Sequence, residues 1–422
     1  SLELGKVDSS LFKSFKKRNG LPVFLRGFLS QVFDTSGTLL DTPSVDCIDA
    51  VRQLTLVFSK IERPCTEVRV ARAMRRYVEL EAEMKEWNSS SWKEYLPLFQ
   101  KAATLLFGDV FADVESKLLG VSHLRDNWDD NPVPVRARDP FLGLFPSHLF
   151  ENAVGKVINP PSGRGSVDRQ WLVPRHGPGA TADRLRGNAK FDVVVWPQRL
   201  ERVFPYGDYA LPMLGRDDQL DRVQFLEPGK EQPVKVVSVP KTQKTPRIIA
   251  EEPTAMQYMQ QALSYELVTR LENVLKRGVP SNVSVSVAEK RSDLGGHVIG
   301  FANQEPNRLM ASEGSHYGQL ATLDLSEASD RVFNQHVELL FSRFPRLSEA
   351  VQATRSLKAD VPGHGVIPLT KFASMGSALC FPVEAMVFTA IVFSAIAHQR
   401  RVPLTRGLIL SLRGKVRVYG DD

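Results

Sequence analysis

The fold of the carboxyl-terminal part is decided by Gln319-Leu-Ala-Thr-Leu-Asp324-Leu-Ser-Glu-Ala-Ser-Asp330, an apolar run that ends in a carboxylate. A helical pattern follows from Val332 to Phe341, so the order strand, acid, helix is predicted. A carboxylate at the carboxyl end of a strand projects into the crevice where α/β sheets bind ligands. Asp330 has a second interpretation as the N-cap of that helix, a position that favours Asp.

Two adjacent acids, Asp421 and Asp422, follow the strand-like run 416–419. Gly420 permits a tight turn between the run and the acids. Adjacent carboxylates on a hairpin tip repel each other unless a cation lies between them and Asp324. Mg²⁺ suits such a site, because it prefers hard oxygen ligands, retains waters and completes its shell with phosphates.

A basic strip reads Lys241-Thr-Gln-Lys244-Thr-Pro-Arg247, with cations at steps of three in an extended segment. A nucleoside triphosphate needs several cations, because its charge is concentrated and the leaving pyrophosphate gathers more during reaction. The strip is therefore a candidate lining for one side of a nucleotide channel. A solvated basic loop explains the strip equally well when it is considered by itself.

A loop of small residues reads Phe372-Ala-Ser374-Met375-Gly376-Ser377 and leads into an apolar helix pattern from 378 to 397. Small residues let a backbone come close to a ligand. Pro382 and Glu384 interrupt the apolar pattern, which then falls short of the ~20 residues that a membrane span needs. A buried core helix is predicted.

The composition is that of an ordinary globular protein whose excess positive charge suits a polyanionic partner, although a mildly basic soluble protein explains that charge equally well. The 422 residues include 42% hydrophobic and 24% charged residues, and the formal net charge is +6. Three cysteines, far apart and odd in number, support neither a disulfide framework nor a zinc site, so a reducing cytosol is expected. Neither a secretory signal nor a membrane association is expected.

Outside these segments, periodicity predicts helices over 47–60 and 67–87, a strand over 234–239 and a long helix from Thr254. Residues 159–215 are rich in Gly, Pro and Arg and predict a surface loop. His176 in that loop has no partner at metal-ligand spacing, so a structural role is at least as well supported as contact with a phosphate.

Taken in order, the basic strip, the Asp324 segment, the Ser-Met-Gly loop and Tyr-Gly-Asp-Asp resemble the conserved motifs of viral RNA-dependent RNA polymerases. The Asp324–Asp330 segment, the basic strip that runs into Glu252-Pro253, and the His176-Gly-Pro-Gly-Ala cluster most resemble the replicases of single-stranded RNA phages. The resemblance is specific from Pro174 onward and thin before it.

This resemblance implies an α+β right-hand polymerase with fingers and palm. Residues 1–150 would form a mostly helical part of the fingers, 151–308 the fingers with the basic strip where NTPs come in, and 309–422 the palm. The family places later palm motifs and a thumb after Tyr-Gly-Asp-Asp. The chain is therefore expected to be a fragment that lacks the thumb and is inactive by itself.

The resemblance also implies roles for individual residues. The catalytic acids and ligands of two Mg²⁺ ions, for which Mn²⁺ is a substitute, would be Asp324, Asp421 and Asp422. The triphosphate-binding cations would be Lys241, Lys244 and Arg247. The readers of the ribose 2′-hydroxyl would be Asp330, Ser374 and Ser377, beside Met375 and Gly376 of the template and nucleotide loop.

One departure from the family concerns Ser377, because RNA-phage replicases usually carry asparagine there. A hydroxyl both donates and accepts hydrogen bonds, so ribose recognition can survive this change.

The implied function is template-directed RNA synthesis, in which a 3′-hydroxyl attacks the NTP α-phosphate and pyrophosphate leaves. The implied partners are template RNA, nascent RNA, NTPs and the host elongation factors Tu and Ts, in the cytoplasm of an infected bacterial cell. Two alternatives remain open. A reverse transcriptase shares the palm, although Asp330 and the small-residue loop favour ribonucleotides, and a non-catalytic basic RNA-binding protein would use its acids structurally.

Overall fold

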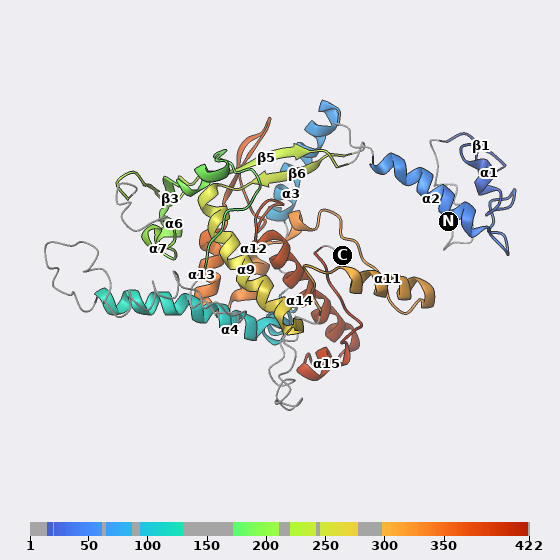
Figure 1. Ribbon diagram of the computed structural model, residues 1–422. Helices are drawn as coiled ribbons and strands as arrows, with labels where there is room; N and C mark the ends of the chain where they lie inside the picture. The colour runs from blue at the N-terminus through green and yellow to red at the C-terminus, as the bar shows by residue number, and fades with distance from the viewer. Residues whose placement is uncertain are drawn as a thin grey trace, which may run out of the picture. The chain divides into compact units, whose positions relative to one another are not determined.

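The computed structural model describes residues 15–19, 21–60, 65–86, 93–129, 172–210, 220–241, 245–276 and 298–420 (Figure 1). The chain divides into two compact units. Unit 1 comprises Ser1–Met74 and Ser238–Ile248, and unit 2 comprises Arg75–Val237 and Ile249–Asp422. Helices and strands occur together, in agreement with the predicted α+β class. The boundaries predicted at residues 150 and 308 stay a prediction.

The helices of both units include all the helices expected from periodicity. They are α1 (Arg26–Leu29), α2 (Val45–Lys60), α3 (Glu67–Glu86), α4 (Leu96–Asp129), η2 (Gly187–Phe191), α6 (Gln198–Glu201), α7 (Tyr206–Tyr209), α9 (Thr254–Lys276), α11 (Glu305–Tyr317), η4 (Ser329–Arg331), α12 (Asn334–Phe341), α13 (Pro345–Thr354), α14 (Cys380–Arg400) and α15 (Arg406–Ser411). The helix predicted from Thr254 is thereby confirmed as α9.

Within the described ranges, the strands form three small sheets. They are β1 (Lys17–Arg18), β2 (Leu21–Pro22), β3 (Val195–Pro197), β4 (Gln224–Leu226), β5 (Val234–Val239), β6 (Arg247–Glu251), β7 (Lys358–Val361) and β8 (Gly365–Pro368). The largest sheet has the order β6-β5-β7-β8, with β5 parallel to β7 and β7 antiparallel to β8. The predicted strand 234–239 is confirmed as β5.

The core of unit 2 is helical. α4 contacts α9, α12, α13 and α14, and these helices lie close together in Figure 1. Along α9, one apolar face is buried: Met256, Met259, Leu263, Leu267 and Leu271 are each at most 1% exposed. Burial of this continuous apolar surface is the main favourable contribution to the stability of the unit.

α14 is the predicted core helix. Its length and composition would suffice to cross a membrane, but 67% of its apolar window is buried within the protein. Neither Pro382 nor Glu384 ends the helix. Pro382 lies in the first turn, where a backbone N–H has no intrahelical acceptor, so the proline ring is tolerated there.

The predicted strand before Asp324 is not formed. Residues 319–325 follow α11 and have no strand partner among the described residues. α11 ends at Tyr317 and is capped by Gly318, which takes a left-handed φ of 67°. The chain then turns back so that Leu320 packs against Gly314. In the strand-like run 416–419, Val418 makes an isolated bridge to Ile299.

The predicted surface loop 159–215 is also partly wrong. Within the described portion from 172 to 210, Trp196, Leu200, Phe204 and Tyr206 are at most 1% exposed and belong to the core of unit 2. His176 stacks on Tyr258 with the ring centroids 4.3 Å apart. Burial, together with the charge of Lys190, lowers the pKa of His176 to about 4, which is consistent with a structural role.

Candidate active site

Asp324 lies exposed between α11 and η4. Within the part of the chain that the structure describes, its carboxylate has no hydrogen bond or ion pair, so its hard oxygens are free to bind a cation such as Mg²⁺. Asp421 and Asp422 lie outside the described residues. Among the residues described, no group of three His, Cys, Asp or Glu side chains is arranged so that it could hold a metal ion, so the predicted metal site stays a prediction.

Two of the three predicted triphosphate-binding cations lie within the described residues. Lys241 and Arg247 are exposed, just after β5 and at the first residue of β6, and both belong to unit 1. Lys244 is outside the described residues. Asp324 belongs to unit 2, so the proposed joint action of strip and acid stays a prediction.

Asp330 pairs with a buried lysine. The Nζ of Lys371 donates to Oδ1 of Asp330 at 2.9 Å, and the lysine side chain is 0% exposed. Asp330 therefore does not cap the following helix, because α12 begins after Phe333 without a side-chain cap. The carboxylate offsets part of the cost of burying an ammonium group.

Two residues of α3 complete the surroundings of Lys371. Its Nζ lies 3.5 Å from Oε1 of Glu81 and 3.4 Å from the centroid of the Tyr77 ring. Burial lowers the pKa of Lys371, but the negative charge of Asp330 and the contributions of Tyr77 and Glu81 outweigh it, so the pKa is raised. Lys371 is therefore a charged group in the core.

The small-residue loop is tied to the same cluster. The hydroxyls of Ser374 and Tyr77 are hydrogen bonded at 2.8 Å, and Ser374 is only 5% exposed. Gly376 has a φ of 133°, and a Cβ there would overlap the carbonyl oxygen of Ala250. Glycine is required at this position because the loop lies against β6, where the N–H of Ala250 donates to the Met375 carbonyl at 2.8 Å.

Ser377 faces a different partner from Ser374. Its hydroxyl donates to Oε1 of Gln260 at 3.1 Å, and the N–H of Ala378 donates to the same oxygen at 3.2 Å. The two serines predicted to read the ribose are thus both hydrogen bonded, one to α3 and one to α9. Neither of these partners was predicted from the sequence.

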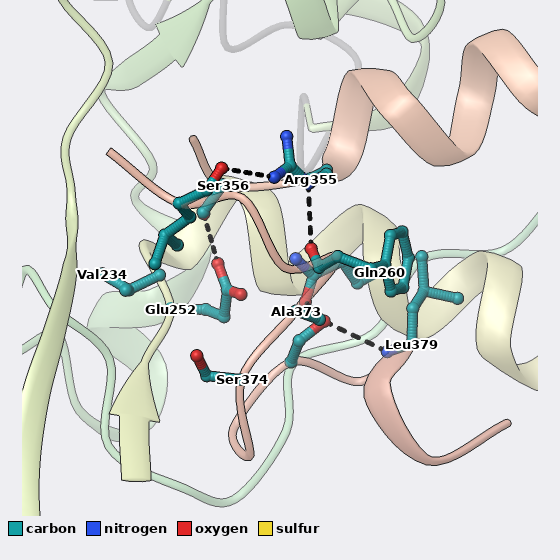
Figure 2. A pocket seen from close by; sticks show the side chains of 11 residues that line it. Val234, Glu252, Gln260, Arg355, Ser356, Ala373, Ser374 and Leu379 are labelled. Carbon is teal, nitrogen blue, oxygen red and sulfur yellow. Dashed lines mark hydrogen bonds between the residues drawn. The ribbon is translucent and has the colours of Figure 1, made fainter. Parts of the chain in front are cut away.

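A small buried pocket lies beneath the loop (Figure 2). The Ser356 hydroxyl donates to Glu252, and the guanidinium of Arg355 donates to the carbonyls of Leu369, Lys371 and Phe372. Burial raises the pKa of Glu252 to about 7, against the lowering effects of Ser356, Gln260, Arg355 and Arg199. The carboxyl therefore titrates near neutrality beneath the loop.

The segment between Asp324 and Asp330 is braced by ion pairs. Glu327 has a left-handed φ of 56°, which is strained for a residue with a side chain. Arg76 of α3 donates from Nε and Nη2 to the two carboxylate oxygens of Glu327, each at 3.0 Å, and Arg331 adds a contact at 3.1 Å. The hydrogen bond from Arg76 is the main reason that the pKa of Glu327 is lowered.

The turn that precedes the terminal acids packs on α14. Gly420 has a φ of 63°, and a Cβ there would overlap the ring of Phe381. Tyr419 contacts the same ring, with centroids 5.6 Å apart. The predicted tight turn at Gly420 is confirmed, and it lies against the helix that follows the small-residue loop.

Comparison with known proteins finds relatives of the segment that carries this site. Residues 288–422 match the family described as RNA replicase, beta-chain. This segment is similar to that family. It contains Asp324, Asp330, Lys371 and the small-residue loop, whereas Tyr77 and Glu81 precede the replicase segment by about two hundred positions.

Three relatives are RNA-phage polymerase subunits. The RNA-directed RNA polymerase subunit beta of Escherichia virus Qbeta is 32% identical over 189 residues, which is 44% of this chain and 26% of the relative. The subunit of Enterobacteria phage SP is 31% identical over 188 residues, 44% of this chain and 27% of the relative. The beta chain of Escherichia phage MS2 is 29% identical over 187 residues, 44% of this chain and 28% of the relative. The chain thus spans about a quarter of the length of these replicases.

Proposed function

We propose that the chain carries the fingers and palm of an RNA-directed RNA polymerase that replicates a phage genome. Residues 1–308 would form the fingers and 309–422 the palm. The observation that carries this proposal is that Asp330 and Ser374, two residues suited to read a ribose, are linked by Lys371 and Tyr77, and that both lie within the replicase segment.

The reaction joins the 3′-hydroxyl oxygen of the nascent strand to the α-phosphorus of an NTP. The bond from that phosphorus to the β-phosphate oxygen breaks, pyrophosphate leaves, and the hydroxyl proton is released. Asp324, Asp421 and Asp422 would hold the two Mg²⁺ ions, which supply hydroxyl activation and charge stabilisation when bound. Lys241, Lys244 and Arg247 would offset the charge that develops on the leaving group.

The ribose would be read by Asp330 and Ser374, with Ser377 as a third candidate. Oδ1 of Asp330 binds Lys371, and Oδ2 has no partner among the described residues, so Oδ2 is free to accept a hydrogen bond from a 2′-hydroxyl. A site built to bind a hydroxyl discriminates strongly against an analogue that lacks it. The arrangement therefore favours NTPs over dNTPs, and an RNA polymerase over a reverse transcriptase.

The partners follow from this activity. Template and nascent RNA would be held through phosphate and shape contacts, since base pairing reads the sequence. The relatives are named as beta subunits, and we propose host elongation factors Tu and Ts as associated subunits, in the cytoplasm of an infected bacterium.

The proposal is tested by template-directed NTP incorporation with the complete replicase. Asp324→Ala and Asp421→Ala are each expected to abolish incorporation and pyrophosphate release, while RNA binding stays near the wild-type value, because metal ligands matter to the reaction more than to phosphate attraction. Retained synthesis in either variant would refute the assignment. RNA binding without metal-dependent pyrophosphate release by the wild type would instead favour a non-catalytic RNA-binding protein.

A further inference from the structure

We propose that Tyr77, Glu81 and Lys371 form a positioning cluster that fixes the ribose readers Asp330 and Ser374 and so sets the preference for NTPs over dNTPs. The inference rests on the proposed polymerase function. It adds that this preference depends on α3, a helix that lies outside the replicase segment.

Lys371 is the centre of the cluster. An ammonium group that is 0% exposed is tolerated only when opposite charges and hydrogen bonds compensate its lost hydration. Here Asp330, Glu81 and the face of the Tyr77 ring lie 2.9, 3.5 and 3.4 Å from Nζ. Because Asp330 keeps 23% of its side chain exposed, it is the member of this set that can reach a ligand.

Tyr77 joins the two readers. The face of its ring lies against the Lys371 ammonium that binds Asp330, and its hydroxyl is hydrogen bonded to Ser374 at 2.8 Å. Tyr77 is 2% exposed, so packing holds its ring in one orientation. A single rigid side chain therefore sets the position of Asp330 relative to Ser374.

Glu81 fixes the backbone that leads into the loop. Its Oε2 accepts hydrogen bonds from the N–H groups of Thr370 and Lys371, while Oε1 faces the Lys371 ammonium. The carboxylate thus holds both the main chain and the side chain of Lys371. The main chain enters the small-residue loop at the next residue, Phe372.

Catalytic groups need to be held close to their productive geometry by surrounding hydrogen bonds. Loosening the cluster should leave the chemistry available and weaken only the recognition of the 2′-hydroxyl. We therefore expect substitutions in the cluster to lower kcat/KM for NTPs more than for dNTPs. A purely structural role would lower both values by the same factor.

The test uses Tyr77→Phe in the complete replicase, because this change removes one hydroxyl and keeps the ring over Lys371. The measured quantity is the ratio of kcat/KM for an NTP to that for the matching dNTP. We expect this ratio to fall about 10-fold, the size that loss of a hydrogen bond at a polar recognition site produces. Glu81→Gln is a second variant and is expected to shift the ratio in the same direction.

Tyr206→Phe is the matched control. Tyr206 is 1% exposed, and its hydroxyl donates to the Val193 carbonyl at 2.8 Å, so the control removes an equally buried hydroxyl that is not connected to the readers. Its ratio should equal that of the wild type. An unchanged ratio in folded Tyr77→Phe and Glu81→Gln would overturn the inference. Absence of incorporation by the wild type would refute the proposed function itself, a result that appears before any substitution is made.

Discussion

Replacement of Glu252 by glutamine should change how the stability of the protein depends on pH. Glu252 is 3% exposed in the pocket of Figure 2, where it accepts a hydrogen bond from Ser356. Burial raises the pKa of this carboxyl from 4.5 to about 7. The folded protein therefore favours the protonated form, whereas the unfolded chain ionises near the ordinary value.

The magnitude follows from linkage between protonation and folding. A raised folded-state pKa contributes stability that is complete below pH 4.5 and is lost as the pH rises to about 7. At about 1.4 kcal/mol per pH unit, this group removes about 3 kcal/mol of unfolding free energy across that window. Glutamine does not ionise, so this loss is absent from the variant. As the pH rises from 4.5 to about 7, the unfolding free energy of the variant should therefore increase by about 3 kcal/mol relative to that of the wild type.

The assay is urea unfolding of wild type and Glu252→Gln at pH 5 and pH 8. The contributions of most other titrating groups to the unfolding free energy are the same in both proteins, so they cancel in the difference. Glu266→Gln is the control, because it breaks ion pairs of 2.9 and 3.3 Å with Lys117 and Arg270 and should be destabilised at pH 8. The reasoning fails if the difference between Glu252→Gln and wild type is the same at both pH values.

Two further predictions concern the loops of the site. Gly376→Ala should lower the unfolding free energy by about 2 to 4 kcal/mol, because the new Cβ adds backbone strain and breaks the Ala250–Met375 hydrogen bond. Gly363→Ala should lower the unfolding free energy by less, because Gly363 also has a positive φ, of 80°, but a Cβ added there would meet no other atom. Equal urea midpoints for the two variants would contradict this account. Arg76→Ala should cost about 1 kcal/mol or less, since its pair with Glu327 is partly exposed, yet reduce nucleotide incorporation more than the exposed control Arg308→Ala. Equal activities of these two variants would show that the Arg76–Glu327 pair does not position the Asp324–Asp330 segment for the reaction.

Much of the helical structure could be predicted, because apolar periodicity reports burial directly. The face of α9 and the core helix α14 are examples. The strand before Asp324 could not be predicted reliably, since a strand needs a neighbour to pair with, and sequence pattern does not specify that neighbour. In this structure, Leu320 of that segment packs against Gly314 of α11 instead of pairing with a strand.

The candidate site was only partly predictable for the same reason. Asp330 and Ser374 were recognised because each belongs to a motif, but their partners are set by tertiary contacts over long separations. Tyr77 lies 297 positions from Ser374. A faint signal existed in Glu81, an acid between the buried Leu80 and Met84 on α3, because a charge on an apolar helix face is tolerated only with a partner.

The central claim is that Asp324 and Asp421 bind the same cations in the folded replicase. Binding of Mn²⁺, followed by electron paramagnetic resonance in the complete replicase, tests this claim without requiring activity. We predict that Asp324→Asn and Asp421→Asn each weaken Mn²⁺ binding, and that the double variant loses much less than the sum of the two single losses, since both acids serve one site. Unchanged binding in either single variant, or fully additive losses, would contradict the account.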